Sequence, residues 1–192
     1  MQTSFVALLA LSASALAMPS APAPSEQFTC QNATEGFAWS MTLFLYESAE
    51  IFTTPSHQNA DGKVSFNISN PGLLSLQSSS GCSGDSVQYP DYFYGNTVYE
   101  CIDPRTDTNT KTTFAYDSPS ALLSVNQTWT CPDATNPITF FAAGSVNLTL
   151  ITSKRNYSNP DWKMGETYSS KTTVSNGPYL VPITAFHISA IA

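Results

Sequence analysis

Charged side chains are scarce in this sequence. Asp, Glu, Lys and Arg make up 11% of its 192 residues, with seven basic residues against 14 acidic ones. The basic residues are dispersed singly, except for the adjacent Lys154 and Arg155. Nucleic acids and anionic membrane surfaces are bound by clustered Lys and Arg. The sequence therefore argues against both as partners.

Spacings that mark a catalytic or metal site are also missing. The sequence holds two histidines, His57 and His187, and no C-x-x-C pair, so it does not favour a zinc site. We expect His57 in a solvated turn and His187 in the core or at a sheet edge. The aspartates fall mainly in turns and lack the spacing of a calcium loop, and the SSGCSG run at 79–84 lacks the G-x-S-x-G spacing of a serine nucleophile. We predict no catalytic residue, no metal site and no cofactor. The sequence therefore favours a protein that is not an enzyme.

The apolar run Phe5–Ala17 is too short to span a membrane, because a spanning helix needs roughly 20 residues. It ends in Ala15-Leu16-Ala17, the small-x-small pattern that signal peptidase cleaves. We therefore predict a signal peptide at residues 1–17, a Pro/Ala/Ser-rich leader at 18–27, and no transmembrane segment. The protein is expected to be secreted and extracellular, with cell-wall association as an alternative.

A chain that enters the secretory route meets the glycosylation machinery, so its sequons of the form Asn-x-Ser/Thr are candidate N-glycosylation sites. Five occur, and Asn70 is excluded because Pro71 follows it. Their side chains are expected to face outward. The predicted acceptors are Asn32, Asn67, Asn126, Asn147 and Asn156.

Helical periodicity is absent beyond the N-terminal run, and apolar residues alternate with polar ones instead. The segment Val64–Ile68 alternates in this way, which predicts a half-buried strand. In an earlier strand the pattern places Trp39, Met41 and Leu43 on the inward face. Short strands separated by turn signals predict an all-β fold, as a single compact antiparallel β-barrel or sandwich.

Turn signals set the predicted ends of the other strands. Asp61-Gly62 is interpreted as a turn. The segment 154–170 is expected to be a loop, and the chain end is predicted as a final strand that closes the sheet, with a lipid-anchor signal as the rival. Further strands are predicted at Leu73–Gln77, Val98–Ile102, Thr112–Tyr116, Ala121–Thr130, Ile138–Ala142 and Ser145–Thr152.

Four cysteines, Cys30, Cys82, Cys101 and Cys131, are an even number for an oxidising compartment, which predicts disulfides. Three pairings are possible. Cys82 and Cys101 flank a Tyr-rich loop, and closing a loop of about 20 residues would contribute roughly 3 kcal/mol. This pair is therefore favoured, which leaves Cys30 with Cys131.

The Tyr-rich loop, Tyr89–Cys101, is the strongest candidate for recognition. Its Tyr and Phe rings can present flat amphipathic surface to a protein, a sugar or a planar small molecule. The alternative is that half of the rings pack over the end of the sheet. The candidate binding surface comprises Tyr89, Tyr92, Phe93, Tyr94 and Tyr99.

This loop belongs to a series of short motifs. The stretch Thr29–Glu47 contains Cys30, a T-E-G triplet at 34–36, Trp39 and Phe44. Later motifs are VYEC at 98–101, TTFAYDSPSALLSVNQTWTC at 112–131 and FFAAGSVNLTLITS at 140–153. In these motifs, and in their order, the sequence resembles the fungal Alternaria major allergen family.

The resemblance implies a compact secreted β-barrel over residues 28–153 with no established enzymatic activity. Residues 154–192 then form a C-terminal extension beyond the family's usual end. Family members are allergens or plant-infection factors, which implies an effector role in virulence. The implied partners are a plant defence protein of the thaumatin-like class, or a flavonoid-like small molecule bound at a dimer interface.

One departure from the family bears on the cysteines. The family's last cysteine has no counterpart here, because residues 138–143 are ITFFAA. In the family the early cysteine can bridge two subunits. Without a fifth cysteine, Cys131 needs Cys30 within the same chain, so a disulfide-linked dimer is not favoured.

These observations favour a secreted fungal binding protein without enzymatic activity, which engages a host protein or a small apolar ligand. A small-barrel enzyme of secondary metabolism, a cyclase or isomerase, is the first alternative. A barrel interior filled by large side chains would argue against it; the residues concerned are Trp39, Met41, Phe66 and Leu123. A cell-wall or spore-coat structural protein is the second alternative.

Overall fold

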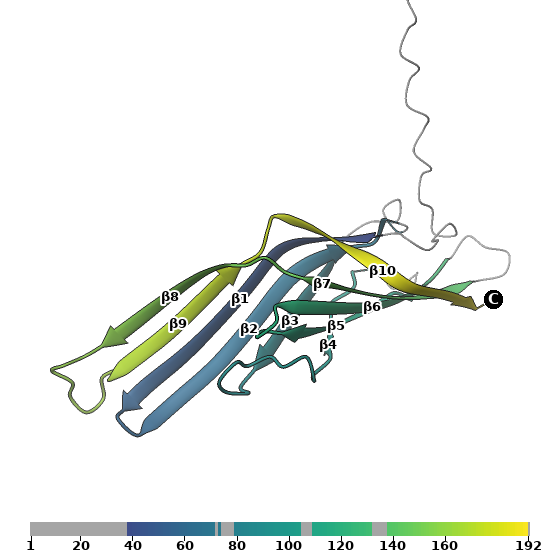
Figure 1. The fold of residues 1–192 in the computed structure, drawn as a ribbon. Helices are drawn as coiled ribbons and strands as arrows, with labels where there is room; N and C mark the ends of the chain where they lie inside the picture. Colours follow the sequence, from purple (N-terminus) through teal and green to yellow (C-terminus); the bar gives the residue numbers. More distant parts are fainter. Residues whose placement is uncertain (1–37, 72, 74–78, 105–108, 132–137, 192) are drawn as a thin grey trace, which may run out of the picture.

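The structure, a computed structural model, describes residues 38–71, 73, 79–104, 109–131 and 138–191. Among these residues no helix is long and apolar enough to cross a membrane. The strands (Figure 1) are β1 (Ala38–Thr54), β2 (His57–Ser69), β3 (Ser80–Ser86), β4 (Tyr99–Glu100), β5 (Lys111–Asp117), β6 (Leu122–Thr130), β7 (Thr139–Asn147), β8 (Ile151–Ser158), β9 (Ser169–Asn176) and β10 (Leu180–Ile191).

Eight strands follow one another around a nearly closed antiparallel barrel, in the order β3-β2-β1-β10-β7-β6-β5-β4. The two end strands meet at a seam, where Gly81 and Ile102 exchange backbone hydrogen bonds with N···O distances of 3.0 and 2.7 Å. The Cys82–Cys101 disulfide joins the same two segments. The predicted all-β, disulfide-stapled fold and the favoured cysteine pair are confirmed.

β1 changes its neighbour half-way along its length. Residues Ala38–Thr42 pair with β10, whereas Leu45–Phe52 pair with β9. Between these parts lies a β-bulge at Leu43, where φ is +59°. A bulge inserts a residue and so reverses which face the following side chains occupy. Leu43 is 60% exposed, so the prediction that it faces inward is wrong.

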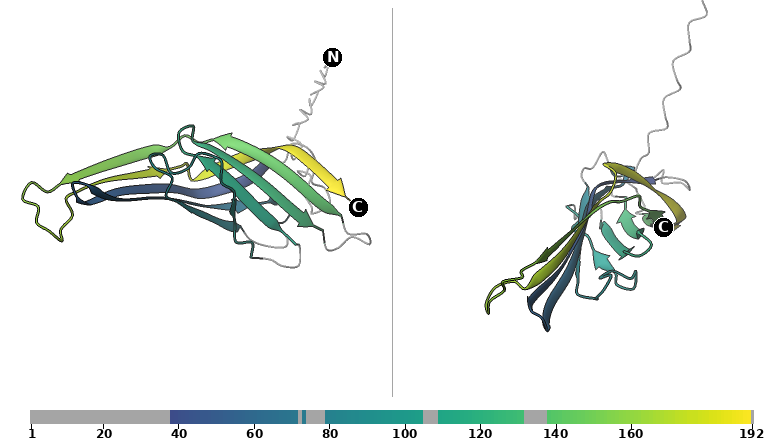
Figure 2. Two further views of the ribbon diagram at one scale, coloured as in Figure 1. Left: turned by 90° about the horizontal axis from the view of Figure 1, so that it is seen from below. Right: turned by 60° about the vertical axis from the view of Figure 1, so that its left-hand side comes forward.

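Beyond the bulge, four strand segments form an extension of the sheet that we call the arm. It comprises β8, β9, residues 47–54 of β1 and residues 57–63 of β2. In Figures 1 and 2 the arm runs out to one side of the barrel strands β4–β7. Every residue of its edge strand β8 is exposed. The arm is therefore a sheet that leads away from the core.

The barrel interior is filled by large side chains. Trp39, Met41 and Leu123 are fully buried, and Phe66 is 3% exposed. The predicted alternation of Val64–Ile68 places its three apolar side chains in this core. The filled interior argues against a wide lumen in this part of the barrel.

The Asp61-Gly62 pair lies inside β2 and is not a turn, so that prediction is wrong. The hairpin turn falls at Pro55 and Ser56, where Thr54 pairs with His57. Gly62 has a packing role instead, because a Cβ at this position would lie 2.6 Å from the Cβ of Tyr92. Glycine within a strand often marks such a close approach.

Two predictions after residue 138 are also corrected. β7 runs unbroken from Thr139 to Asn147 through Gly144, whose missing Cβ gives room to the Trp39 ring. There is consequently no separate strand at Ser145–Thr152. The predicted loop at 154–170 contains most of β8. β10 lies between β1 and β7.

Candidate binding cleft

The loop between β3 and β4 is fixed to the end of the barrel by backbone contacts. The Ser118 amide donates to the Phe93 carbonyl at 2.8 Å, and the Gly95 amide donates to the Tyr116 carbonyl at 2.9 Å. The Tyr92 hydroxyl reaches across to the carbonyl of Ala49 in the arm at 3.3 Å. The loop is therefore tied to both parts of the molecule.

The five predicted recognition residues divide into a buried and an exposed group. Tyr92 and Phe93 are each 2% exposed, and Tyr99 is half-buried. Phe93 packs against Tyr46, Tyr99 and Tyr116 with ring centroids about 6 Å apart. Tyr89 and Tyr94 are 54% and 39% exposed. Of the five, only these two are exposed.

A cleft of about 430 Å³ lies between the arm and this loop. Its lining includes polar side chains of β1, β8 and β9, the loop residues Pro90, Asp91 and Tyr92, and the rings of Tyr46 and Tyr116. The volume falls within the range of small-molecule sites. The polar residues on the arm side include Ser48, Glu50, Thr152, Lys154, Thr173 and Ser175.

Strand register explains how the arm contributes to the cleft. Ser48 pairs with Thr173, which in turn pairs with Lys154, and Glu50 pairs with Lys171. Side chains directly opposite each other in an antiparallel pair lie on the same face. Side chains alternate along a strand, so Ser48 and Glu50 lie on the face of the arm that lines the cleft. The odd-numbered residues of β1 between and beside them lie on the opposite face.

Two tyrosines of the cleft, Tyr92 and Tyr116, have raised pKa values. Burial, followed by the charge of Glu50, raises the pKa of Tyr92 to about 12. Burial, followed by Tyr46, also raises the pKa of Tyr116. The Glu50 carboxylate lies 3.3 Å from the Lys171 ammonium group. The cleft thus offers neutral hydroxyl donors and acceptors beside one paired carboxylate, an arrangement suited to hydrogen bonding.

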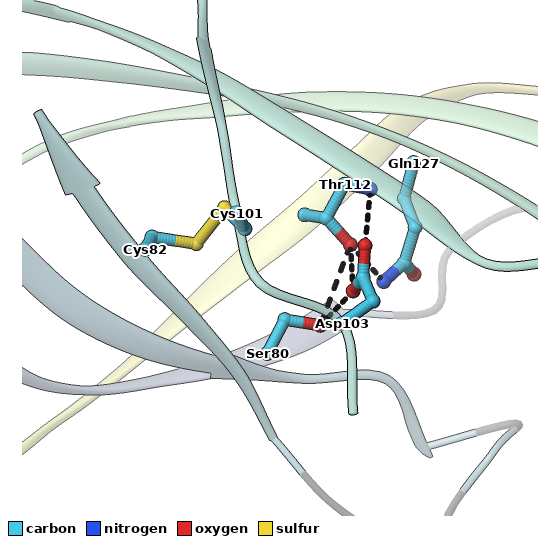
Figure 3. Close-up of a disulfide and its surroundings, with 6 residues drawn as sticks. All are labelled: Ser80, Cys82, Cys101, Asp103, Thr112 and Gln127. Carbon is cyan, nitrogen blue, oxygen red and sulfur yellow. Dashed lines mark hydrogen bonds between the residues drawn. A yellow bond between two sulfur atoms is a disulfide. The ribbon is translucent and has the colours of Figure 1, made fainter. Parts of the chain in front are cut away.

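A second polar cluster lies at the seam (Figure 3) and is structural. The Asp103 carboxylate accepts hydrogen bonds from the Thr112 amide and hydroxyl, both at 2.8 Å, and from the Ser80 hydroxyl. Gln127 donates to the Thr112 hydroxyl at 2.9 Å and accepts from the Trp39 indole at 2.8 Å. Buried polar groups require such partners. The sequence placed the aspartates mainly in turns and did not predict this buried cluster.

The family to which the chain belongs follows from a match to a known family model. Residues 41–170 match the model of the family described as Alternaria alternata allergen 1. The chain belongs to this allergen family. The match begins in β1 and ends in β9, so the family region includes β8 and extends past Ser153. Comparisons with curated proteins and with solved structures gave no match.

Membership of the allergen family confirms the resemblance that the motifs indicated. Together with the disulfide, it is consistent with a secreted protein. The predicted signal peptide and leader lie outside the described residues. Cys131 takes part in a disulfide, whereas its expected partner Cys30 lies outside the described residues.

The other candidate residues of this allergen-family chain are spread over its surface. Asn126, Asn147 and Asn156 are exposed, Asn67 is half-buried, and Asn32 lies outside the described residues. His57 is exposed beside the Thr53 hydroxyl at 3.0 Å, as expected of a turn residue. Of the two positions predicted for His187, the core and a sheet edge, the core is wrong, because His187 is exposed on β10. In the described part of the chain, no group of three or more His, Cys, Asp and Glu side chains could hold a metal ion.

Proposed function

We propose that this protein acts outside the cell by binding and not by catalysis, and that the cleft takes a small planar molecule that carries hydroxyl groups, such as a plant phenolic compound. The observation that carries the proposal is the cleft itself. Tyrosine rings line it at the barrel end, and the hydroxyl, carboxylate and ammonium groups of the arm surround it. Rings offer stacking surface to a planar ligand, and hydroxyl groups fix its orientation.

The charge distribution favours a neutral ligand over an anionic one. The chain has a net charge of −7. The cleft itself adds little to this charge, because Lys154 accompanies Asp91 in its lining and Lys171 pairs with Glu50. An anionic ligand would be repelled by this field. Because the lining is largely polar, we expect a ligand with hydroxyl groups and not an apolar one.

Two rival functions receive less support. A cyclase or isomerase would need an open interior, whereas Trp39, Met41 and Leu123 fill the barrel. The raised pKa values of Tyr92 and Tyr116 also make these hydroxyls poor acids near neutral pH. A cell-wall or spore-coat role predicts that the protein stays with the wall during mild extraction. Free release into culture medium would exclude that role.

A plant defence protein is the other candidate partner, and the exposed Tyr89 and Tyr94 are where it would dock. These two rings lie on the same loop as the cleft residues Pro90 and Asp91. A protein partner could therefore contact the loop from outside while a small ligand occupies the cleft.

The test is to titrate a panel of plant phenolic compounds into the purified secreted protein by calorimetry and tyrosine fluorescence. Ser48→Phe places a ring in the cleft and should weaken binding at least about tenfold, which corresponds to 1.4 kcal/mol. Ala49→Phe is the matched control, since the neighbouring residue points to the opposite face of the arm. Absence of any phenolic ligand, equal effects of the two variants, or chemical conversion of the ligand would overturn the proposal.

A further inference from the structure

A hollow of about 310 Å³ lies on the outside of the barrel and shares no lining residue with the cleft. It crosses β5, β6, β7 and β10. Among the residues that line it are Asn126 and Thr128, the first and last residues of one glycosylation sequon. The acceptor side chain of a predicted glycan therefore opens into this hollow.

Strand register accounts for the hollow. Thr113, Asn126, Ala143 and His187 pair in succession across the four strands, so they form one row on the outer face. Thr113 and Ala143, the direct neighbours of Asn126 on either side, are small. Side chains this short leave space beside the acceptor, and the hollow is the result.

The adjacent row provides an apolar wall. Lys111, Thr128 and Phe141 pair in succession two residues along the strands, on the same face as Asn126. The Phe141 ring is 37% exposed although it lies over the barrel. An exposed ring beside a hollow is a surface that a neighbouring group can cover.

We propose that the glycan attached at Asn126 lies in this hollow, with the apolar face of its first N-acetylglucosamine residues against Phe141. The attachment point fixes the occupant, because the first sugar is bonded to the Asn126 side-chain nitrogen and cannot leave the vicinity of the hollow. The sugar's ring hydrogens form an apolar face that packs on an aromatic ring, and its hydroxyl and acetamido groups can bond Lys111, Thr113 and His187. The glycan then covers part of the barrel.

Asn156 provides the internal comparison. It lies on the edge strand β8, where all eight residues are exposed. The cross-strand neighbour of Asn156 is Lys171, which is followed by Glu50 in the same row, so a glycan there lacks an aromatic ring like Phe141 to pack against. The two sequons therefore share a chemistry and differ in their surroundings.

The experiment uses the full-length protein secreted by a glycosylating fungal host. Peptide mass mapping establishes occupancy at Asn126 and Asn156, and thermal unfolding is measured for wild type, Asn126→Gln and Asn156→Gln. We expect Asn126→Gln to lower Tm by about 2–4 °C and to raise binding of an apolar fluorescent dye, while Asn156→Gln changes neither. Trimming both glycans to a single sugar should preserve most of the effect.

Phe141→Ser separates glycan packing from a general effect of the Asn126 substitution. In the Phe141→Ser background, Asn126→Gln should no longer change Tm, because the wall of the hollow is gone. An upfield shift of the ring-hydrogen resonances of the first N-acetylglucosamine in wild type, absent in Phe141→Ser, would report the contact with the Phe141 ring directly. The proposal is overturned if Asn126 carries no glycan, or if its loss has the same effect with and without the Phe141 ring.

Discussion

The barrel and the arm use the same strand β1 in two different environments. In its barrel half, Trp39 and Met41 are fully buried, whereas in its arm half Ile51 is 37% exposed. Burial of apolar area is the main favourable contribution to folding. The comparison shows that the barrel supplies the stability of the molecule, while the arm supplies surface and one side of the cleft. The bulge at Leu43 lies at the boundary between them.

The largest expected difference between the two regions comes from truncating one side chain in each. Trp39→Ala removes a fully buried ring and the hydrogen bond to Gln127, so it should cost about 3–5 kcal/mol of unfolding free energy. Ile51→Ala should cost no more than about 1 kcal/mol, since the side chain is already partly solvated. Urea unfolding of both variants measures the contrast. Equal losses would mean that the arm shares the stability of the core.

Opening the seam should weaken the barrel without affecting the arm. Replacing Cys82 and Cys101 together by Ala removes the covalent link between β3 and the segment after β4. The expected loss is about 3 kcal/mol. Hydrogen exchange should show faster exchange of the Gly81 and Ile102 amides, which pair across the seam. If β8 and β9 lose protection to the same extent, the two regions do not behave independently.

Gly62→Ala tests the joint between the regions. The added Cβ would lie 2.6 Å from the Cβ of Tyr92, so either the strand or the loop must shift, at a cost of about 1–3 kcal/mol. Because Tyr92 lines the cleft, ligand binding should weaken as well. Gly81→Ala is the control, since its nearest contact is the Asn67 Oδ1 at 3.9 Å. Similar effects of the two substitutions would argue against the close Tyr92 packing.

A smaller effect is expected from high pH. Folding raises the pKa of Tyr92 from 10.0 to about 12. Between these values the unfolded chain releases the tyrosine proton and the folded chain keeps it, so stability is full below pH 10 and falls as the pH rises toward 12. Tyr92→Phe should flatten this decline. Glu50→Gln removes the second cause of the shift, so the tyrosinate absorbance should appear at a lower pH. An unchanged absorbance curve in both variants would show that Tyr92 does not contribute.

Alternation predicted the strands whose two faces differ. The predicted segments 112–116 and 121–130 end within a few residues of β5 and β6, and the predicted segment 64–68 lies inside the longer β2. In each, buried and more exposed residues alternate. The disulfide at the seam was also predictable, since its two cysteines bracket one loop. These features depend on neighbours close in the sequence.

Features that depend on distant contacts were not predictable. Gly62 and Gly144 resemble turn residues in the sequence, and only the approach of Tyr92 and Trp39 explains them. The bulge at Leu43 reversed the pattern of β1 because β9 replaces β10 as its partner there. The cleft escaped prediction for the same reason. Its Tyr loop was identified, but its other side comes from β8 and β9, which were expected to be loop or tail.

The position of β10 has a consequence for how the chain folds as it is made. β10 lies between β1 and β7. The first described strand of the chain therefore completes its pairing only when the last strand has been synthesised. A chain synthesised from its N-terminus leaves one edge of Ala38–Thr42 unpaired until residues 180–184 have emerged. Unpaired strand edges attract other strands. Completion of the barrel, and protection from aggregation, therefore depends on the final segment of the described chain.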